Sequence, residues 1–274
     1  MTRWFRLEYL SGCRIEGADA FEFCQSQFTA DVDSLTEQRW QQLAWCSRKG
    51  RVRFLSIAKR NQDHVELVFP AVQAGLLKEL ALFTIGRKVG IGPVQAMAGA
   101  WTGGQDTYVG EDRFGRVLRL LSESEDDPGA PDRESLERWL LQDKLAPLPW
   151  LDDRTQDRFL PQALGLENNG GLSYTKGCYP GQEIVARVHY LGRAPERLTA
   201  LRVESSEPLT SRELTRADAT TSDGQRVTLL SVARQDDHLI GLAVVPDKAG
   251  SSDTIEFELD GSRLQAKMTP VGSL

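Results

Sequence analysis

The sequence has few of the residues that would mark it as a metal or disulfide protein. Only four cysteines occur in 274 residues, at positions 13, 24, 46 and 178, and none forms a Cys-x-x-Cys pair. Histidine is equally scarce, with three residues. This spacing predicts neither a zinc site nor a cluster site, so no metal site is expected. It favours reduced thiols in the cytoplasm.

Long apolar runs are also missing. The longest, at residues 239–245, is far shorter than the roughly 20 residues of a membrane helix. The first ten residues, MTRWFRLEYL, lack the apolar core of a signal peptide. We therefore expect a cytoplasmic protein that does not associate with membranes. Because 39 acidic residues outnumber 33 basic ones, the net charge disfavours direct nucleic-acid binding.

Hydrophobic periodicity predicts an α+β fold. Helical spacing is expected over residues 19–28, 70–84 and 133–145. Strand-like runs separated by turn residues cover 40–46, 52–58, 64–69, 88–98 and 115–121 in the first half, then 198–203, 226–233, 238–245, 254–259 and 264–268. The second set of short strands is typical of a small antiparallel β-barrel. An exposed connector at 122–131, SESEDDPGAP, joins two modules.

The most informative segment is Tyr174 to Arg187, which reads YTKGCYPGQEIVAR. Lys176 beside Cys178, and a helix that begins after Pro180-Gly181, would both favour the thiolate form of the cysteine. A small residue in a tight Gly/Pro turn explains the same cysteine equally well. No histidine can be placed beside it from the sequence alone, so the pattern does not assign a Cys–His pair.

Three further features have an ordinary interpretation beside a functional one. Trp139 is either helix core or an aromatic wall for a flat ligand. Asp31 either caps a turn or contacts a ligand. Between residues 39 and 60 there are seven Lys or Arg and no Asp or Glu. That run is either a solvated strand face or a receptor for carboxylates or an acidic partner.

The segment Lys176-Gly-Cys-Tyr-Pro-Gly-Gln-Glu183, followed by Val185-Ala-Arg187, resembles the signature KGCYxGQE…AR of the YgfZ branch of the glycine-cleavage T-protein family. Two other blocks agree with that family: residues 17–19 with 27–32, GAD and QFTADV, and residues 46–51, CSRKGR. Together the blocks place the resemblance over roughly residues 10 to 193.

The resemblance implies two fused antiparallel-sheet/helix lobes that form a folate-binding body, with a C-terminal antiparallel β-barrel. The corresponding domains are residues 1–125, 126–196 with the cysteine motif, and 197–274. The implied ligand is tetrahydrofolate or a one-carbon derivative. The implied function is support of the assembly or repair of iron–sulfur enzymes, including tRNA-modifying ones, so the partners would be those enzymes or their assembly proteins. No defined reaction is implied.

The family also suggests which residues carry the function. Chemistry is expected at Cys178, helped by Lys176 and Tyr179. Contacts to folate are expected from five residues: Trp139, Asp31, Gln182, Glu183 and Arg187.

One position departs from the family pattern, because Leu145 stands where relatives have the glutamate that holds the pterin ring in the T-protein. Asp143 is an alternative carboxylate, although helical spacing turns it to a different face from residue 145. Two other functions therefore stay open. One is a tetrahydrofolate-dependent aminomethyltransferase, and the other is a folate-free protein-interaction scaffold.

Overall fold

The computed structural model describes residues 3–101, 115–122, 124, 126–192, 194–204, 218–221, 224–235, 238–247, 254–259 and 262–271. The chain divides into two compact units. We call residues 1–131, 151–161 and 166–190 the sheet unit, and residues 132–150, 162–165 and 191–274 the barrel unit. The segment 126–196 contributes to both units, and the division into three domains stays a prediction.

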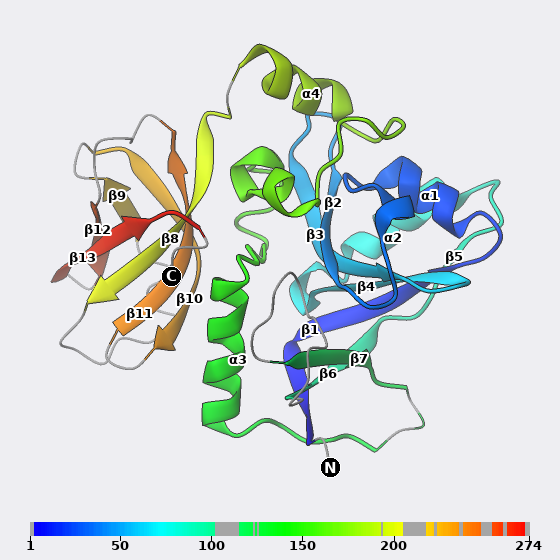
Figure 1. The fold of residues 1–274 in the computed structure, drawn as a ribbon, viewed down its shortest axis with the longest axis horizontal. Helices are drawn as coiled ribbons and strands as arrows, with labels where there is room; N and C mark the ends of the chain where they lie inside the picture. Colours follow the sequence, from blue (N-terminus) through cyan, green and yellow to red (C-terminus); the bar gives the residue numbers. More distant parts are fainter. Residues whose placement is uncertain are drawn as a thin grey trace. The chain divides into compact units, whose positions relative to one another are not determined.

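The sheet unit is built on one antiparallel sheet with the strand order β2-β3-β4-β1-β6-β7 (Figure 1). Its strands are β1 (Trp4–Glu16), β2 (Gln41–Cys46), β3 (Val52–Arg60), β4 (His64–Pro70), β6 (Gln95–Trp101) and β7 (Arg116–Leu120), with a short β5 (Gly90–Ile91) beside β1. The long strand β1 lies inside the sheet between β4 and β6. Sequence analysis missed β1, although alternation of buried Phe5 and Leu7 with polar neighbours is a strand signal.

Two helices share one hydrophobic core with this sheet. They are α1 (Ala20–Gln27) and α2 (Leu76–Ala81), and the core includes Phe23 of α1, Leu77 of α2 and Phe69 of β4. The helix expected over 70–84 is shorter than predicted. It is divided into the 3₁₀ turns η2 (Ala71–Gln73) and η3 (Leu82–Thr84) on either side of α2, as is common at helix ends. The strand expected over 88–98 is likewise split around Pro93, which has no N–H to donate.

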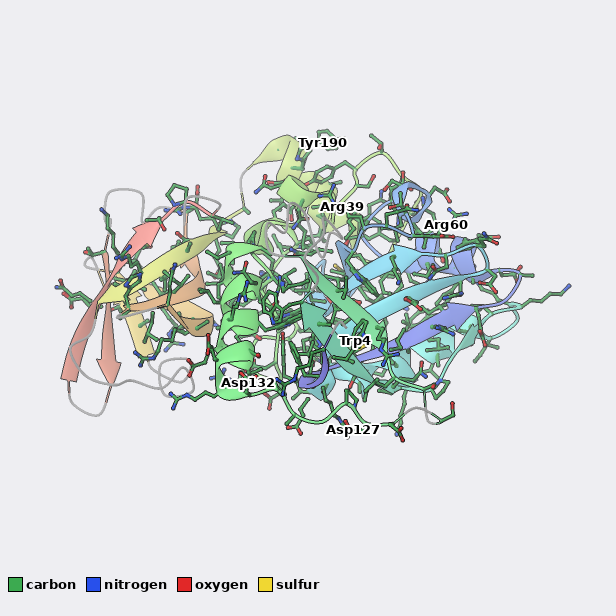
Figure 2. The ribbon with its side chains drawn as sticks, turned by 60° about the horizontal axis from the view of Figure 1, so that its bottom comes forward. Trp4, Arg39, Arg60, Asp127, Asp132 and Tyr190 are labelled. Carbon is green, nitrogen blue, oxygen red and sulfur yellow. The ribbon has the colours of Figure 1, made fainter. Side chains whose placement is uncertain are left out.

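The barrel unit contains α3 (Arg133–Leu145) and a closed barrel with the strand order β10-β11-β8-β13-β12-β9. The barrel strands are β8 (Glu196–Glu204), β9 (Asp218–Thr221), β10 (Arg226–Gln235), β11 (His238–Pro246), β12 (Thr254–Leu259) and β13 (Ser262–Thr269). Asp132, labelled in Figure 2, caps α3 because its carboxylate accepts the Ser135 N–H at 2.8 Å. β9 was not anticipated. The α+β class with a C-terminal antiparallel barrel is confirmed.

The remaining helix, α4 (Gln182–Leu191), begins directly after Pro180-Gly181, as the sequence predicts. The chain also forms three other short 3₁₀ turns, which are η1 (Val32–Ser34), η4 (Gln162–Leu164) and η5 (Leu166–Asn169). Across the described residues, none of the helices combines the length and the apolar character that crossing a membrane requires.

Candidate functional site

The three sequence blocks that resemble the family meet in the sheet unit. Thr29, in the first block, hydrogen-bonds both to β2 and to the segment before the cysteine motif. Its backbone N–H donates to the Ala44 carbonyl of β2 at 2.9 Å, and its hydroxyl donates to the Gly171 carbonyl at 2.6 Å. The Thr29 carbonyl accepts the Ser173 N–H at 2.9 Å. Residues 27–31 are therefore held between β2 and the segment that leads into the cysteine motif.

The third block packs against the motif through two glycines. Gly50 and Gly181 have φ of +71° and +80°, a backbone conformation that residues other than glycine rarely adopt. A Cβ added at Gly181 would lie 2.4 Å from the Ser47 carbonyl oxygen and 2.6 Å from the Gly50 Cα. Residues 46–51 and 174–187 thus meet backbone to backbone, which explains why both positions carry glycine.

Lys176 connects the motif to the first block. Its ammonium donates to the Phe28 and Ala30 carbonyls at 2.6 and 2.7 Å, and it lies 5.5 Å from the centre of the Tyr179 ring. Burial disfavours the charged form and lowers the pKa of Lys176 to about 8, although the carboxylate of Asp31 opposes this shift. The lysine therefore acts first as an anchor for the motif loop.

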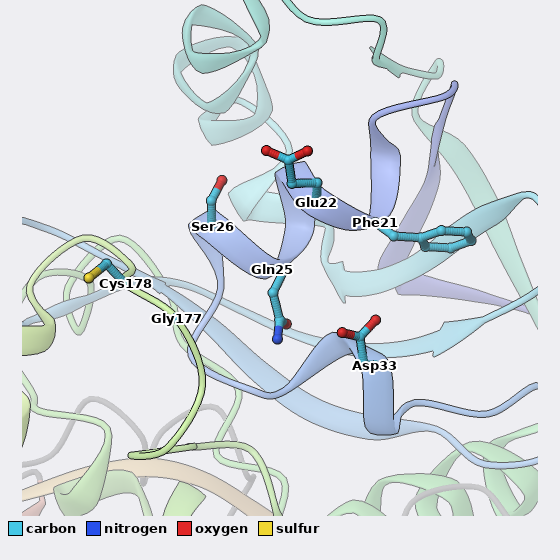
Figure 3. A pocket seen from close by; sticks show the side chains of 7 residues that line it. All are labelled: Phe21, Glu22, Gln25, Ser26, Asp33, Gly177 and Cys178. Carbon is cyan, nitrogen blue, oxygen red and sulfur yellow. The ribbon is translucent and has the colours of Figure 1, made fainter.

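Cys178 is exposed and lines a pocket of about 420 Å³, while Cys13, Cys24 and Cys46 are buried. The other lining residues come from α1, η1 and the adjacent motif glycine: Phe21, Glu22, Gln25, Ser26, Asp33 and Gly177. Figure 3 shows Cys178 at one end of this pocket and Phe21 at the other. Two carboxylates, Glu22 and Asp33, line the pocket, and each is paired with an arginine: Glu22 with Arg87 at 3.7 Å and Asp33 with Arg60 at 2.7 Å.

The structure also shows the surroundings of two other predicted residues, Asp31 and Tyr179. Asp31 caps η1, since its carboxylate accepts the Asp33 N–H at 3.2 Å and the Gln25 amide at 2.8 Å. Tyr179 is buried, and its hydroxyl has no hydrogen-bond partner among the described residues. Burial raises the pKa of Tyr179, so the phenol stays protonated.

The predicted ligand residues of α4 lie on its first turns. Glu183 and Arg187 are exposed, Gln182 is half-buried, and Val185 supplies the buried contact. Arg187 therefore offers an accessible cation, the kind of group that a glutamyl tail needs.

Sequence analysis missed an aromatic cluster at the end of α4. The rings of Tyr174 and His189 stack with centroids 3.8 Å apart, and the Tyr174 hydroxyl donates to Glu167 at 2.8 Å. Tyr190, labelled in Figure 2, lies edge-on to both rings and is exposed. The tyrosine that opens the motif was the available signal, but its contact with α4 depends on the fold of the loop.

Trp139 belongs to the barrel unit, where it is completely buried on α3. Asp143 lies one helical turn further along and is equally buried, and its carboxylate accepts the Trp150 indole N–H at 3.0 Å. Residues four apart share a helix face, so Asp143 accompanies Trp139, whereas Leu145 is half-buried. The indole and the carboxylate are thus neighbours on one buried face of α3.

In the described ranges, the His, Cys, Asp and Glu side chains form no group of three or more that could hold a metal ion. The sheet unit therefore presents one candidate site, the anchored and exposed thiol of Cys178. The barrel unit holds the predicted Trp139, with Asp143 beside it on α3.

Comparisons with known proteins agree with this description. No family model matches the chain. The chain is 29% identical over 241 residues to a curated protein of Colwellia psychrerythraea named tRNA-modifying protein YgfZ, covering 77% of this chain and 74% of that protein. The crystal structure of the glycine cleavage system aminomethyltransferase T from Bartonella henselae has a similar fold, with a TM-score of 0.69 and 13% identity over 99% of this chain and 86% of that chain.

Proposed function

We propose that this chain, which is similar to a YgfZ protein in sequence and to a glycine-cleavage aminomethyltransferase in fold, belongs to the YgfZ/GcvT-like family and is a cytoplasmic folate-binding accessory protein for iron–sulfur enzymes. The observation that carries the proposal is the convergence of the three family-like blocks on one loop that presents an exposed Cys178. Loops placed by a rigid scaffold commonly carry function. Here the scaffold holds the loop by the Lys176 and Gly181 contacts described above.

The ligand proposed is tetrahydrofolate or a one-carbon derivative. Within the barrel unit, Trp139 would provide the aromatic wall and Asp143 the carboxylate for the pterin. Arg187 remains a candidate cation on α4. Of the other expected contacts, Gln182 and Glu183 remain candidates on α4. Asp31 is better explained as the cap of η1. Bound folate would supply one-carbon chemistry, and the residues of the chain would bind and orient it.

The partners proposed are iron–sulfur enzymes or the proteins that assemble them, including enzymes that modify transfer RNA, a context that the name of the Colwellia relative suggests. The chemistry assigned to the chain itself is limited to Cys178, whose thiol is accessible from a pocket. Lys176 and Tyr179 are positioning residues, since one anchors the loop and the other is buried beneath it.

A cell experiment tests this function. In a strain that lacks its own copy of the gene, the wild-type chain should restore the level of thiolated or otherwise modified nucleosides in transfer RNA, and Cys178→Ser should not. Ser26→Ala, which changes a lining residue of the same pocket, is the matched control and should restore the modification. Equal restoration by Cys178→Ser, at equal protein level, would contradict an active role of the thiol.

One observation favours the scaffold alternative: Asp143 already accepts a hydrogen bond from Trp150, and Leu145 adds no carboxylate. The scaffold predicts that Cys178→Ser is harmless and that folate does not bind. The aminomethyltransferase alternative predicts release of ammonia from an aminomethyl-lipoyl donor when tetrahydrofolate is added. We expect no such release.

A further inference from the structure

Six of the seven cations in the basic run of residues 39–60 fall into two groups once the fold is known, and Arg39, which precedes β2, belongs to neither. Three of its cations are engaged by carboxylates: Arg53 by Glu79 at 2.9 Å and Asp157 at 3.1 Å, Lys59 by Glu66 at 2.9 Å, and Arg60 by Asp33 at 2.7 Å. These pairs stabilise the sheet and its neighbours. They leave the cations of the turn between β2 and β3 as a separate group.

That group is Arg48, Lys49 and Arg51. Arg48 and Lys49 are exposed, and within the described part of the chain neither side chain has an ion pair. The Arg51 guanidinium donates to the Arg158 carbonyl at 2.7 Å. A guanidinium has five N–H donors, so this bond fixes its direction and leaves others for a ligand. Three positive charges therefore gather on a chain whose overall charge is −6.

The three cations line a pocket of about 690 Å³ in the sheet unit, together with Trp45, Phe83 and Pro180. Asp157 also lines it, but its carboxylate is paired with Arg53, a fourth lining cation, at 3.1 Å. Phe83 is 47% exposed, and its ring stands edge-on to Trp45 with centroids 5.9 Å apart. The pocket thus has a cationic side and an aromatic side. A volume in the range of about 300–1,000 Å³ suits a small organic ligand rather than a simple inorganic ion.

The walls of this pocket are held in place before any ligand arrives. The turn is closed by the bonds from Ser47 N–H to the Arg51 carbonyl and from Gly50 N–H to the Ser47 carbonyl, at 2.8 and 2.9 Å. Val52 exchanges backbone bonds with residues 157 and 159, at 2.9 and 2.8 Å. A preformed site loses less freedom on binding.

From this arrangement we propose a second binding site, distinct from the pocket of Cys178, for an aromatic compound that carries phosphate groups. Arg48, Lys49 and Arg51 bind the phosphates, since guanidinium groups match phosphate oxygens in paired hydrogen bonds. Phe83 packs against the ring. A ligand with two phosphates complements three cations better than a monocarboxylate does. The site does not depend on folate binding or on Cys178.

The experiment measures binding of ADP, pyrophosphate and adenosine to the purified full chain by isothermal titration calorimetry at low ionic strength. ADP should bind more tightly than either fragment, and the affinity should fall as salt rises. The double variant Arg48→Ala/Lys49→Ala should weaken ADP binding roughly ten-fold or more. Phe83→Ala should weaken ADP binding several-fold and leave pyrophosphate binding unchanged.

The control is Arg226→Ala/Lys267→Ala, which removes two exposed cations from the barrel unit and should leave ADP affinity unchanged. The ligand could be a free nucleotide or a nucleotide within a polynucleotide chain, and competition against bound ADP separates the two. If a single-stranded oligonucleotide displaces ADP more strongly than ADP itself does, the site takes a nucleotide within a chain. Weaker displacement indicates a free nucleotide. Absence of ADP binding, or equal loss in the control and turn variants, overturns the proposal.

Discussion

Lys176 lies in a setting that lowers its pKa to about 8, chiefly because burial disfavours the ammonium. In the unfolded chain the same lysine keeps its proton up to about 10.5. Between these values the unfolded state binds more protons than the folded state, so the contribution of Lys176 to folding stability rises with pH. Below about 8 both states hold the proton and the contribution is constant.

The corresponding prediction compares the wild type with Lys176→Met in urea unfolding from pH 7 to 10.5. The free energy of unfolding of the wild type should increase relative to the variant as the pH rises above 8. Lys78→Met, which removes an exposed lysine of α2, controls for the loss of one surface charge. A difference that stays flat, or falls, over this range would show that the lysine is not desolvated as described.

Gly181 and Gly177 form a matched pair within one motif. A methyl group at Gly181 would collide with backbone atoms of Ser47 and Gly50, and φ there is +80°. At Gly177 nothing lies within 4 Å of an added Cβ. Gly181→Ala should therefore lower the free energy of unfolding by about 1–3 kcal/mol or more, and Gly177→Ala by less than about 0.5 kcal/mol.

Denaturant titrations of both variants check this expectation. Equal stability of the two would contradict the backbone-to-backbone contact of the motif with residues 46–51. Activity in the cell assay gives an independent readout, because Gly177→Ala changes the wall of the Cys178 pocket without straining the fold.

At the scale of elements, an ion-pair network joins three strands of the sheet. Glu66 of β4 contacts Lys59 of β3 at 2.9 Å and Arg14 of β1 at 3.2 Å, and its side chain is 8% exposed. Burial raises the pKa of Glu66, but the hydrogen bond from Lys59 and the charges of both cations outweigh it and hold the pKa below the ordinary 4.5. The network is therefore strongest when the carboxylate is ionised.

Glu66→Gln should lower the free energy of unfolding by about 1–3 kcal/mol at pH 7, because it leaves two cations without their charged partner. Since the folded pKa is depressed, this stabilisation is present above about pH 4.5 and is lost as the pH falls through the folded value. Unfolding curves at pH 7 and pH 3.5 test the shrinking difference. Glu8→Gln, an exposed change on β1, should show little difference at either pH, and an equal effect at Glu8 would argue against the network.

The sequence predicted most elements whose hydrophobic period is regular. The helix at α1 and the strands β2 to β4 appeared within a few residues of their places, because their apolar residues pack in the core. The position of α3 was also predicted, although the residues it buries are mostly polar, with Gln142, Asp143 and Lys144 beside Trp139. β1 was missed although its alternation is a local strand signal. Its pairing with β4 and β6 could not be predicted, because these strands are distant in sequence. The helix at α2 was predicted too long because the hydrophobic periodicity continues into the flanking 3₁₀ turns. These turns differ from an α-helix in their hydrogen bonding and not in their hydrophobic pattern.

At the scale of the molecule, the candidate site is shared by segments that the sequence keeps far apart. The motif itself could be read directly, and so could the place of its cysteine in a Gly/Pro loop. The exposure of that cysteine was learned from the structure. Its attachment to Thr29 and to the turn at Gly50 could not, since contacts over more than 100 residues depend on the folded sheet. For the same reason the sequence of the basic run, residues 39–60, did not indicate which of its cations would form ion pairs with carboxylates.

The central claim is that the chain binds folate, and calorimetric titration of the purified protein with tetrahydrofolate under reducing conditions tests it most directly. We expect saturable binding that is lost in Trp139→Ala and tighter in Leu145→Glu, which restores a carboxylate on a half-buried position. Because burying Trp139 stabilises α3, circular dichroism must show that Trp139→Ala is folded. Absence of binding by the wild type under these conditions would contradict the account and favour the scaffold.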